Sequence, residues 1–148
     1  MTTRGLPHWP WNGAAPEDLP PAEAVLLEAC RAWVEATREG RAPLPALRLP
    51  MVTEGVESAA PALDALLRGL ACPGSMGCRL CPRLTPAEGA LLMGLGLAQR
   101  ATRREALAAF LRLAPPGAAY AAMGPALAVG MAMRRAGLLL AHPLRANS

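Results

Sequence analysis

Three cysteines lie close together in the middle of the chain, in a segment that reads Ala-Cys-Pro-Gly-Ser-Met-Gly-Cys-Arg-Leu-Cys-Pro. Cys78 and Cys81 have the C-x2-C spacing, which in a tight turn brings two sulfurs to one point, as zinc knuckles require. Cys72 can fold back across the Pro-Gly that follows it and add a third thiolate. Arg79, between the pair, favours the thiolate form that a metal needs. The segment therefore predicts a metal site formed by Cys72, Cys78 and Cys81.

A tetrahedral zinc site needs a fourth ligand, which would come from Cys30, His8, His142 or water. Cys30 falls within an apolar helical stripe, where a buried core side chain is the simpler interpretation. Zinc fits better than an iron–sulfur cluster, because the C-x5-C-x2-C spacing is not that of the common bacterial ferredoxins. Two other interpretations stay open, namely free thiols without a metal and a redox-active Cys78–Cys81 pair.

The expected location is the cytoplasm. The first eleven residues contain no apolar stretch of the kind that directs export. Reduced cysteines are then the rule, so metal or redox chemistry is a better interpretation than a disulfide framework. The uncharged stretch 113–133 is mostly Ala and Gly and is interrupted by Pro115, Pro116 and Pro125. Since membrane spans are richer in Leu, Ile, Val and Phe, we expect no membrane partner.

The sequence offers no complete catalytic set. A nucleophilic cysteine needs a neighbouring base, and the two histidines, His8 and His142, lie near the ends of the chain. No phosphate-binding glycine loop and no H-E-x-x-H motif occurs. Glu88 and Glu105 are explained as helix caps. An enzyme is therefore disfavoured, and no catalytic residue is assigned.

Charge is distributed unevenly along the chain. Residues 1–74 carry six arginines against nine acids, and residues 75–148 carry nine arginines against two acids. A basic half raises the prospect of an anionic partner. Two helices joined by residues 100–102 have the spacing of a helix-turn-helix, which would place Arg103 and Arg104 at the start of the recognition helix. DNA binding through these two arginines is therefore an alternative function.

Composition favours an all-α fold, because hydrophobic residues make up 53% of the chain, aromatic residues only 3%, and Ala and Leu dominate. We expect a single domain of about five helices in an orthogonal or irregular bundle. A Pro-rich extended arm that carries Trp9 and Trp11 covers residues 1–21. The helical domain, 22–148, divides into an acidic half (22–71), a cysteine loop (72–84) and a basic half (85–148).

Local signals set the helix boundaries. The first helix starts at Pro21 and ends at Gly40, with an apolar face formed by Val25, Leu26, Ala29, Cys30, Trp33 and Thr37. Residues 41–57, rich in proline, are expected to form a connection. Ser58 is expected to cap a second helix with Pro61 in its first turn and Leu63, Leu66, Leu67 and Leu70 on its buried face.

Two capping boxes, Thr85 to Glu88 and Thr102 to Glu105, start the third and fourth helices. The fourth is expected to run to Pro115. A last helix is expected from about Pro125 to Gly137, with Leu127 and Met131 facing inward and Leu138 making the contact that follows a Gly-terminated helix.

The stretch from Cys78 to Leu140 resembles a family of small bacterial helical proteins that have a short cysteine motif and no assigned activity. The residues that carry the resemblance are Cys78, Cys81, Glu88, Arg104-Glu105-Ala106 and Gly137-Leu138-Leu139-Leu140. The family's cysteine motif is more compact and follows a histidine, where this chain has Cys72. The resemblance implies a helical domain with functional cysteines and no particular reaction.

Together these features predict a non-enzymatic adaptor or regulatory module. Its partner would be another macromolecule, most simply a protein, and its cysteines would hold a structural metal. The alternatives are a helix-turn-helix DNA-binding protein that uses Arg103 and Arg104, and a thiol redox sensor that uses Cys78 and Cys81.

Overall fold

A computed structural model describes residues 13–70 and 76–141, and within these ranges every regular element is a helix. The expected all-α fold class is thereby confirmed. Two short 3-10 helices, η1 (Pro16–Asp18) and η2 (Glu57–Ala59), accompany six α-helices: α1 (Pro21–Arg38), α2 (Pro43–Thr53), α3 (Ala60–Leu70), α4 (Pro86–Arg100), α5 (Arg103–Phe110) and α6 (Pro116–Arg135).

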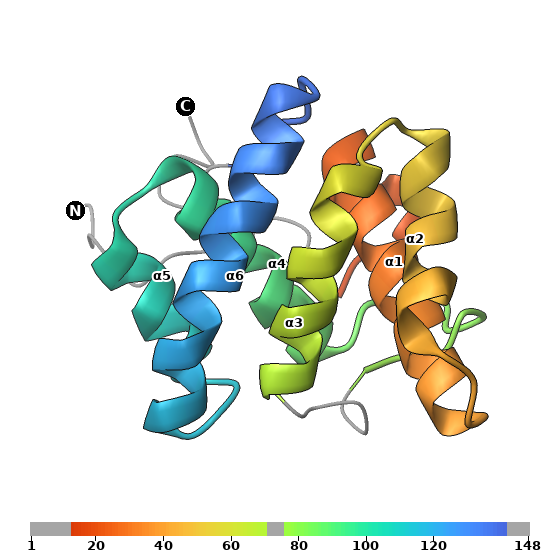
Figure 1. Ribbon diagram of the computed structural model, residues 1–148, viewed down its shortest axis with the longest axis horizontal. Helices are drawn as coiled ribbons and strands as arrows, with labels where there is room; N and C mark the ends of the chain where they lie inside the picture. Colours follow the sequence, from red (N-terminus) through yellow and green to blue (C-terminus); the bar gives the residue numbers. More distant parts are fainter. Residues whose placement is uncertain (1–12, 71–75, 142–148) are drawn as a thin grey trace.

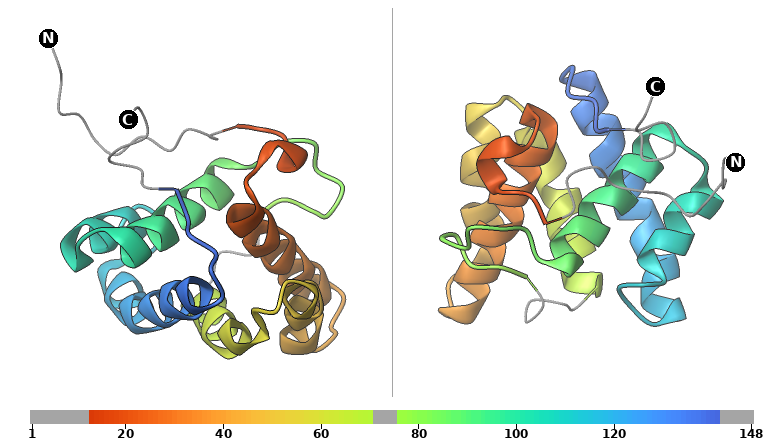
Figure 2. Two further views of the ribbon diagram at one scale, coloured as in Figure 1. Left: turned by 90° about the horizontal axis from the view of Figure 1, so that it is seen from above. Right: turned by 180° about the vertical axis from the view of Figure 1, so that it is seen from behind.

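The helices pack in three groups around one continuous core. Figure 1 shows α1 and α2 at one end of the long axis, α5 at the other, and α3 and α6 side by side between them. α1 packs chiefly on α2, α3 on α6, and α4 on both α5 and α6. The segment that follows residue 76 runs beside η1 before it enters α4 (Figure 2). That course brings the cysteine segment against the N-terminal end of the described chain, where Leu84 N–H donates to the Ala14 carbonyl at 3.0 Å.

α1 starts and ends as the sequence predicts. Pro21 occupies the first turn, where no N–H partner is needed, and Gly40 adopts φ 73° beyond the last turn. The positive φ lets Arg41 N–H reach back to the Ala36 carbonyl at 2.8 Å. Five of the six residues expected on the apolar face are buried, whereas Thr37 is exposed. Cys30 is 1% exposed and belongs to the core.

The expectation of a connection over residues 41–57 is wrong, because α2 occupies Pro43–Thr53. Two of its prolines, Pro43 and Pro45, lie in the first turn, where the missing N–H costs nothing. Leu47 and Met51, one turn apart, are fully buried, so packing on α1 offsets the interior Pro50. Tertiary burial outweighs the low helix propensity of proline here.

α3 presents the expected apolar face, since Leu63, Leu66, Leu67 and Leu70 are all buried. Ser58 does not act as its cap. It lies inside η2, which leads directly into α3, and Pro61 is placed in the first turn of α3 as expected. None of the helices in the described ranges has the length and apolar character needed to span a membrane.

Both capping boxes are present. The hydroxyl of Thr85 accepts from Glu88 N–H and the hydroxyl of Thr102 accepts from Glu105 N–H, each at 3.2 Å, and each carboxylate bonds back to the threonine N–H. The fourth helix ends at Phe110, earlier than the expected stop at Pro115.

The last helix is longer than expected. α6 begins at Pro116 rather than near Pro125, which lies inside it. Buried alanines before and after that proline hold both parts of the helix on the core, at Ala119, Ala122 and Ala126. Leu127 is partly buried against the core, as expected. Met131, also expected to face inward, is instead 56% exposed. Gly137 (φ 81°) ends the helix as predicted, and Leu138 N–H donates to the Met133 carbonyl at 2.9 Å.

Candidate thiol site

The structure brings the sulfurs of Cys78 and Cys81 together. The turn closes with a hydrogen bond from Cys81 N–H to the Cys78 carbonyl at 3.1 Å. The two Sγ atoms lie 3.1 Å apart, and Cys78 N–H also donates to Cys81 Sγ at 3.0 Å. Cys78 is exposed and Cys81 is partly exposed. A soluble reagent can therefore reach a sulfur that already contacts a second thiol.

The turn favours the thiolate of Cys78. The hydrogen bond from the Cys81 thiol lowers the pKa of Cys78 below its ordinary value, and backbone hydrogen bonds at Leu80 and Cys81 lower the pKa further. Arg79, which the sequence suggests for this role, extends instead toward Glu35, with Nε 3.7 Å from the carboxylate. Local hydrogen bonds are thus the main cause of the lowered pKa.

A buried ion pair anchors the turn. Arg31 of α1 donates from Nε and NH2 to the two carboxylate oxygens of Glu88 of α4, at 2.7 and 3.0 Å. The two side chains are 4% and 1% exposed. The same guanidinium donates to the carbonyls of Cys81 and Arg83, at 3.0 and 3.1 Å. Arg31 therefore fixes the backbone on both sides of Pro82.

Glu88 connects the start of α4 to the segment before the cysteines. Besides Arg31, its carboxylate accepts from Thr85 N–H at 2.8 Å and from Gly77 N–H at 3.0 Å. Burial alone would raise the pKa of Glu88, but the hydrogen bonds from Arg31, Thr85 and Gly77 outweigh burial and hold the pKa below its ordinary value. A carboxylate predicted only as a helix cap thus also holds the turn through Gly77 and Arg31.

Sequence reasoning missed Arg31 as a site residue. Its position did carry a signal, because Leu27 and Val34 flank it one turn away on the same side of α1 and both are buried. A charged residue within such a stripe needs a buried partner. Its partner, Glu88, is 57 residues away in the sequence, so local patterns do not identify it.

The other predicted metal ligands do not complete a site within the described ranges. Cys72, His8 and His142 fall outside them, and Trp9 and Trp11 of the predicted arm do as well. Cys30 lies in the core. Across residues 13–70 and 76–141 no three His, Cys, Asp or Glu side chains are placed to hold a metal ion. The zinc site with Cys72 stays a prediction.

The predicted DNA-contacting residues lie on a different part of the fold. Arg103 and Arg104 are exposed in the first turn of α5, after the short link of Ala101 and Thr102. The carboxylate of Glu105 accepts from Thr102 N–H at 3.0 Å, so it occupies one backbone donor at the start of this helix. The DNA-binding function stays a prediction.

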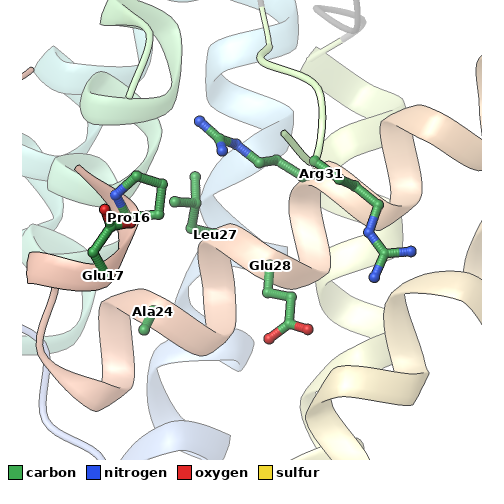
Figure 3. A pocket seen from close by; sticks show the side chains of 7 residues that line it. Pro16, Glu17, Ala24, Leu27, Glu28 and Arg31 are labelled. Carbon is green, nitrogen blue, oxygen red and sulfur yellow. The ribbon is translucent and has the colours of Figure 1, made fainter. Parts of the chain in front are cut away.

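A cavity of about 340 Å³ lies beside the cysteine turn. Its wall comes from η1, α1 and the turn itself, with the lining residues Pro16, Glu17, Ala24, Leu27, Glu28, Arg31 and Arg79 (Figure 3). Arg79 follows Cys78 in the chain, so one wall of the cavity belongs to the turn that carries the exposed sulfur.

Comparison of the chain with known proteins gives no match to a protein family, to a curated protein or to a solved structure.

Proposed function

We propose that this protein is a thiol-based regulatory module in which Cys78 and Cys81 alternate between a dithiol and a disulfide. The observation that carries this proposal is the 3.1 Å separation of two sulfurs, one exposed and the other partly exposed. Apart from an oxidant, a disulfide requires only two thiols, and one four-residue turn supplies both.

The chemistry is thiol–disulfide exchange with a disulfide as the oxidant. The Cys78 thiolate attacks one sulfur of the oxidant, the oxidant's S–S bond breaks, and one thiolate leaves with a proton from solvent. Cys81 then loses its proton and attacks Cys78 Sγ, and the second thiol of the oxidant leaves. One dithiol is oxidised to a disulfide, and one disulfide is reduced to two thiols.

Two contacts support a regulatory role rather than a purely structural one. The turn is tied to α1 through Arg31 and to α4 through Glu88, so a change at the sulfurs acts on the junction of two helices. Between the cysteines, Leu80 is 92% exposed and presents an apolar side chain to a protein partner. Formation of the disulfide would alter the shape of the turn that carries Leu80.

The structural-metal interpretation uses the same sulfurs and needs ligands beyond them. Metal binding is therefore a competing outcome of the experiment that tests the proposal.

In this experiment the reduced protein, purified without chelator, is incubated with the neutral oxidant hydroxyethyl disulfide. Free thiols are then alkylated, and the peptides are mapped by mass spectrometry.

We expect a peptide linked through Cys78 and Cys81, while the core residue Cys30 is alkylated only after denaturation. The proposal is overturned if both cysteines stay free. It is also overturned if about one zinc per chain is retained and protects both thiols from the oxidant.

A further inference from the structure

The cavity beside the cysteine turn has two kinds of lining. Pro16 of η1 and Ala24 and Leu27 of α1 provide an apolar floor, while charged side chains lie around it (Figure 3). Its volume, about 340 Å³, falls within the range of small-ligand sites. An amino-acid-sized group fits a site of this size and mixed polarity.

The charges of opposite sign come from different parts of the wall. Glu17 belongs to η1 and Glu28 to α1; both are exposed, and neither has an ion-pair partner among the residues that the structure describes. The positive charge comes from the cysteine turn, where the Arg79 side chain is 56% exposed and only loosely paired with Glu35 at 3.7 Å. Arg79 can therefore exchange its partner for a ligand carboxylate.

Arg31 lines the cavity without offering a free charge. Its guanidinium is occupied by Glu88 and by the carbonyls of Cys81 and Arg83. The charges available to a ligand are thus two carboxylates and one guanidinium. This combination suits a group that carries both an ammonium and a carboxylate.

We propose that this cavity binds one arm of a small disulfide whose arms are α-amino acids, with the ammonium near Glu17 and Glu28 and the carboxylate at Arg79. This inference rests on the proposed function and names the substrate class of its thiol pair. Because Arg79 directly follows Cys78, an arm held at Arg79 would place the ligand's S–S bond beside the turn that carries the attacking sulfur. Binding would raise the local concentration of the oxidant at Cys78.

The test compares the rates at which four disulfides oxidise the full-length protein. Cystine carries both charges, cystamine only ammonium groups, dithiodipropionate only carboxylates, and hydroxyethyl disulfide none. Each rate is divided by the rate with a short Cys-Arg-Leu-Cys peptide, which corrects for the intrinsic reactivity of each oxidant. For exposed charge pairs we expect each contact to raise the corrected rate about two- to fivefold. Cystine, which can make contacts of both signs, should therefore show the highest corrected rate.

Charge-removing variants assign the two parts of the cavity. Glu17→Gln and Glu28→Gln should lower the rates of oxidation by cystine and cystamine but leave the rate with dithiodipropionate unchanged. Arg79→Gln should lower the rates of oxidation by cystine and dithiodipropionate but leave the rate with cystamine unchanged. Glu57→Gln, an exposed glutamate of η2 outside the cavity, is the matched control and should change none of the four relative rates.

The possible failures are distinguishable. If hydroxyethyl disulfide oxidises the pair but the four corrected rates are equal, the cavity is not a binding site and the proposed function stands. If none of the four disulfides links Cys78 to Cys81, the proposed function fails and this inference fails with it.

Discussion

Arg31 of α1 and Glu88 of α4 are joined by two hydrogen bonds of 2.7 and 3.0 Å, although 57 residues separate them in the sequence. The same arginine holds the Cys81 carbonyl, and the same glutamate holds Gly77 N–H. The buried pair therefore sets the position of both ends of the cysteine turn. The position of the turn on the fold thus depends on side chains that lie outside the cysteine motif.

Removal of one partner of this pair should destabilise the fold strongly. Glu88→Gln leaves Arg31 charged and buried, for which we expect a loss of about 3–5 kcal/mol in the free energy of unfolding. The matched control is Arg68→Ala, which removes the exposed arginine of the pair with Asp64 and should cost about 1 kcal/mol or less. Urea denaturation of both variants measures the difference, and equal losses would contradict the account.

The same carboxylate should make the protein sensitive to acid. The pKa of Glu88 is lower in the folded state than its ordinary value of 4.5. Ionised Glu88 therefore stabilises the folded state fully above pH 4.5, and this stabilisation is lost as the pH falls through the pKa of the folded state. The urea midpoint of the wild type should therefore fall more steeply in this acid window than that of Glu88→Gln. Parallel pH curves would contradict this role of Glu88.

Glu23 should show the opposite pH dependence. Burial raises the pKa of this carboxyl above 4.5, and the hydrogen bond from Ala141 N–H, 2.7 Å long, only partly counters that effect. Its Oε1 atom has no hydrogen-bond partner among the described residues. Protonated Glu23 thus stabilises the folded state, and this stabilisation is lost as the pH rises through the raised pKa of Glu23.

In Glu23→Gln the decline in stability with rising pH should be weaker than in the wild type. The exposed Glu28 of the same helix supplies the control variant, Glu28→Gln, which should leave the curve unchanged. Thermal unfolding at a series of pH values measures both. A decline of the same size in Glu23→Gln would show that Glu23 does not titrate with folding.

The lowered pKa of Cys78 should depend on the donor at Cys81. Cys81→Ala removes the hydrogen bond that lowers the pKa most, so the pKa of Cys78 should move back toward its ordinary value. Cys81→Ser keeps a donor and should retain more of the effect. The pH dependence of Cys78 alkylation, followed by peptide mapping, gives the pKa in each variant. Profiles for both variants that match the wild type would assign the effect to the backbone hydrogen bonds.

Close packing of α4 on α5 gives a test of the fold itself. A Cβ atom on Gly94 would lie 2.9 Å from Cε1 of Phe110, which is fully buried. Gly94→Ala should therefore destabilise the protein by about 1–3 kcal/mol. Gly117→Ala, in the first turn of α6, adds a carbon that meets no other part of the described chain within 4 Å beyond its own helix backbone and chain neighbours, so it should be neutral or stabilise by up to about 1 kcal/mol. Equal effects in urea denaturation would contradict the packing.

Features with local causes could be predicted from the sequence. Each capping box is a motif of four consecutive residues that determines where its helix starts. Gly40 and Gly137 end α1 and α6 through a positive φ. The C-x2-C spacing likewise implies that the two sulfurs meet. These predictions needed no knowledge of distant contacts.

Features with tertiary causes could not be predicted in this way. α2 forms despite its prolines because Leu47 and Met51 are buried against other helices. α6 continues through Pro125 for a similar reason, since alanines on both sides of that proline are buried. The link between Arg31 and Glu88 depends on how α1 and α4 meet, which no local pattern encodes.

The most direct test of the central claim is the product that forms when Cys78 reacts. A variant with Cys30→Ala and Cys72→Ser keeps only Cys78 and Cys81, and it is treated with one equivalent of an aromatic disulfide whose released thiolate absorbs visible light. We expect release of two thiolates per chain and a protein mass lower by two hydrogens, because Cys81 displaces the adduct from Cys78. With Cys81→Ser added, one thiolate should be released and the adduct should remain on Cys78. A stable adduct on Cys78 while Cys81 is present would contradict the account.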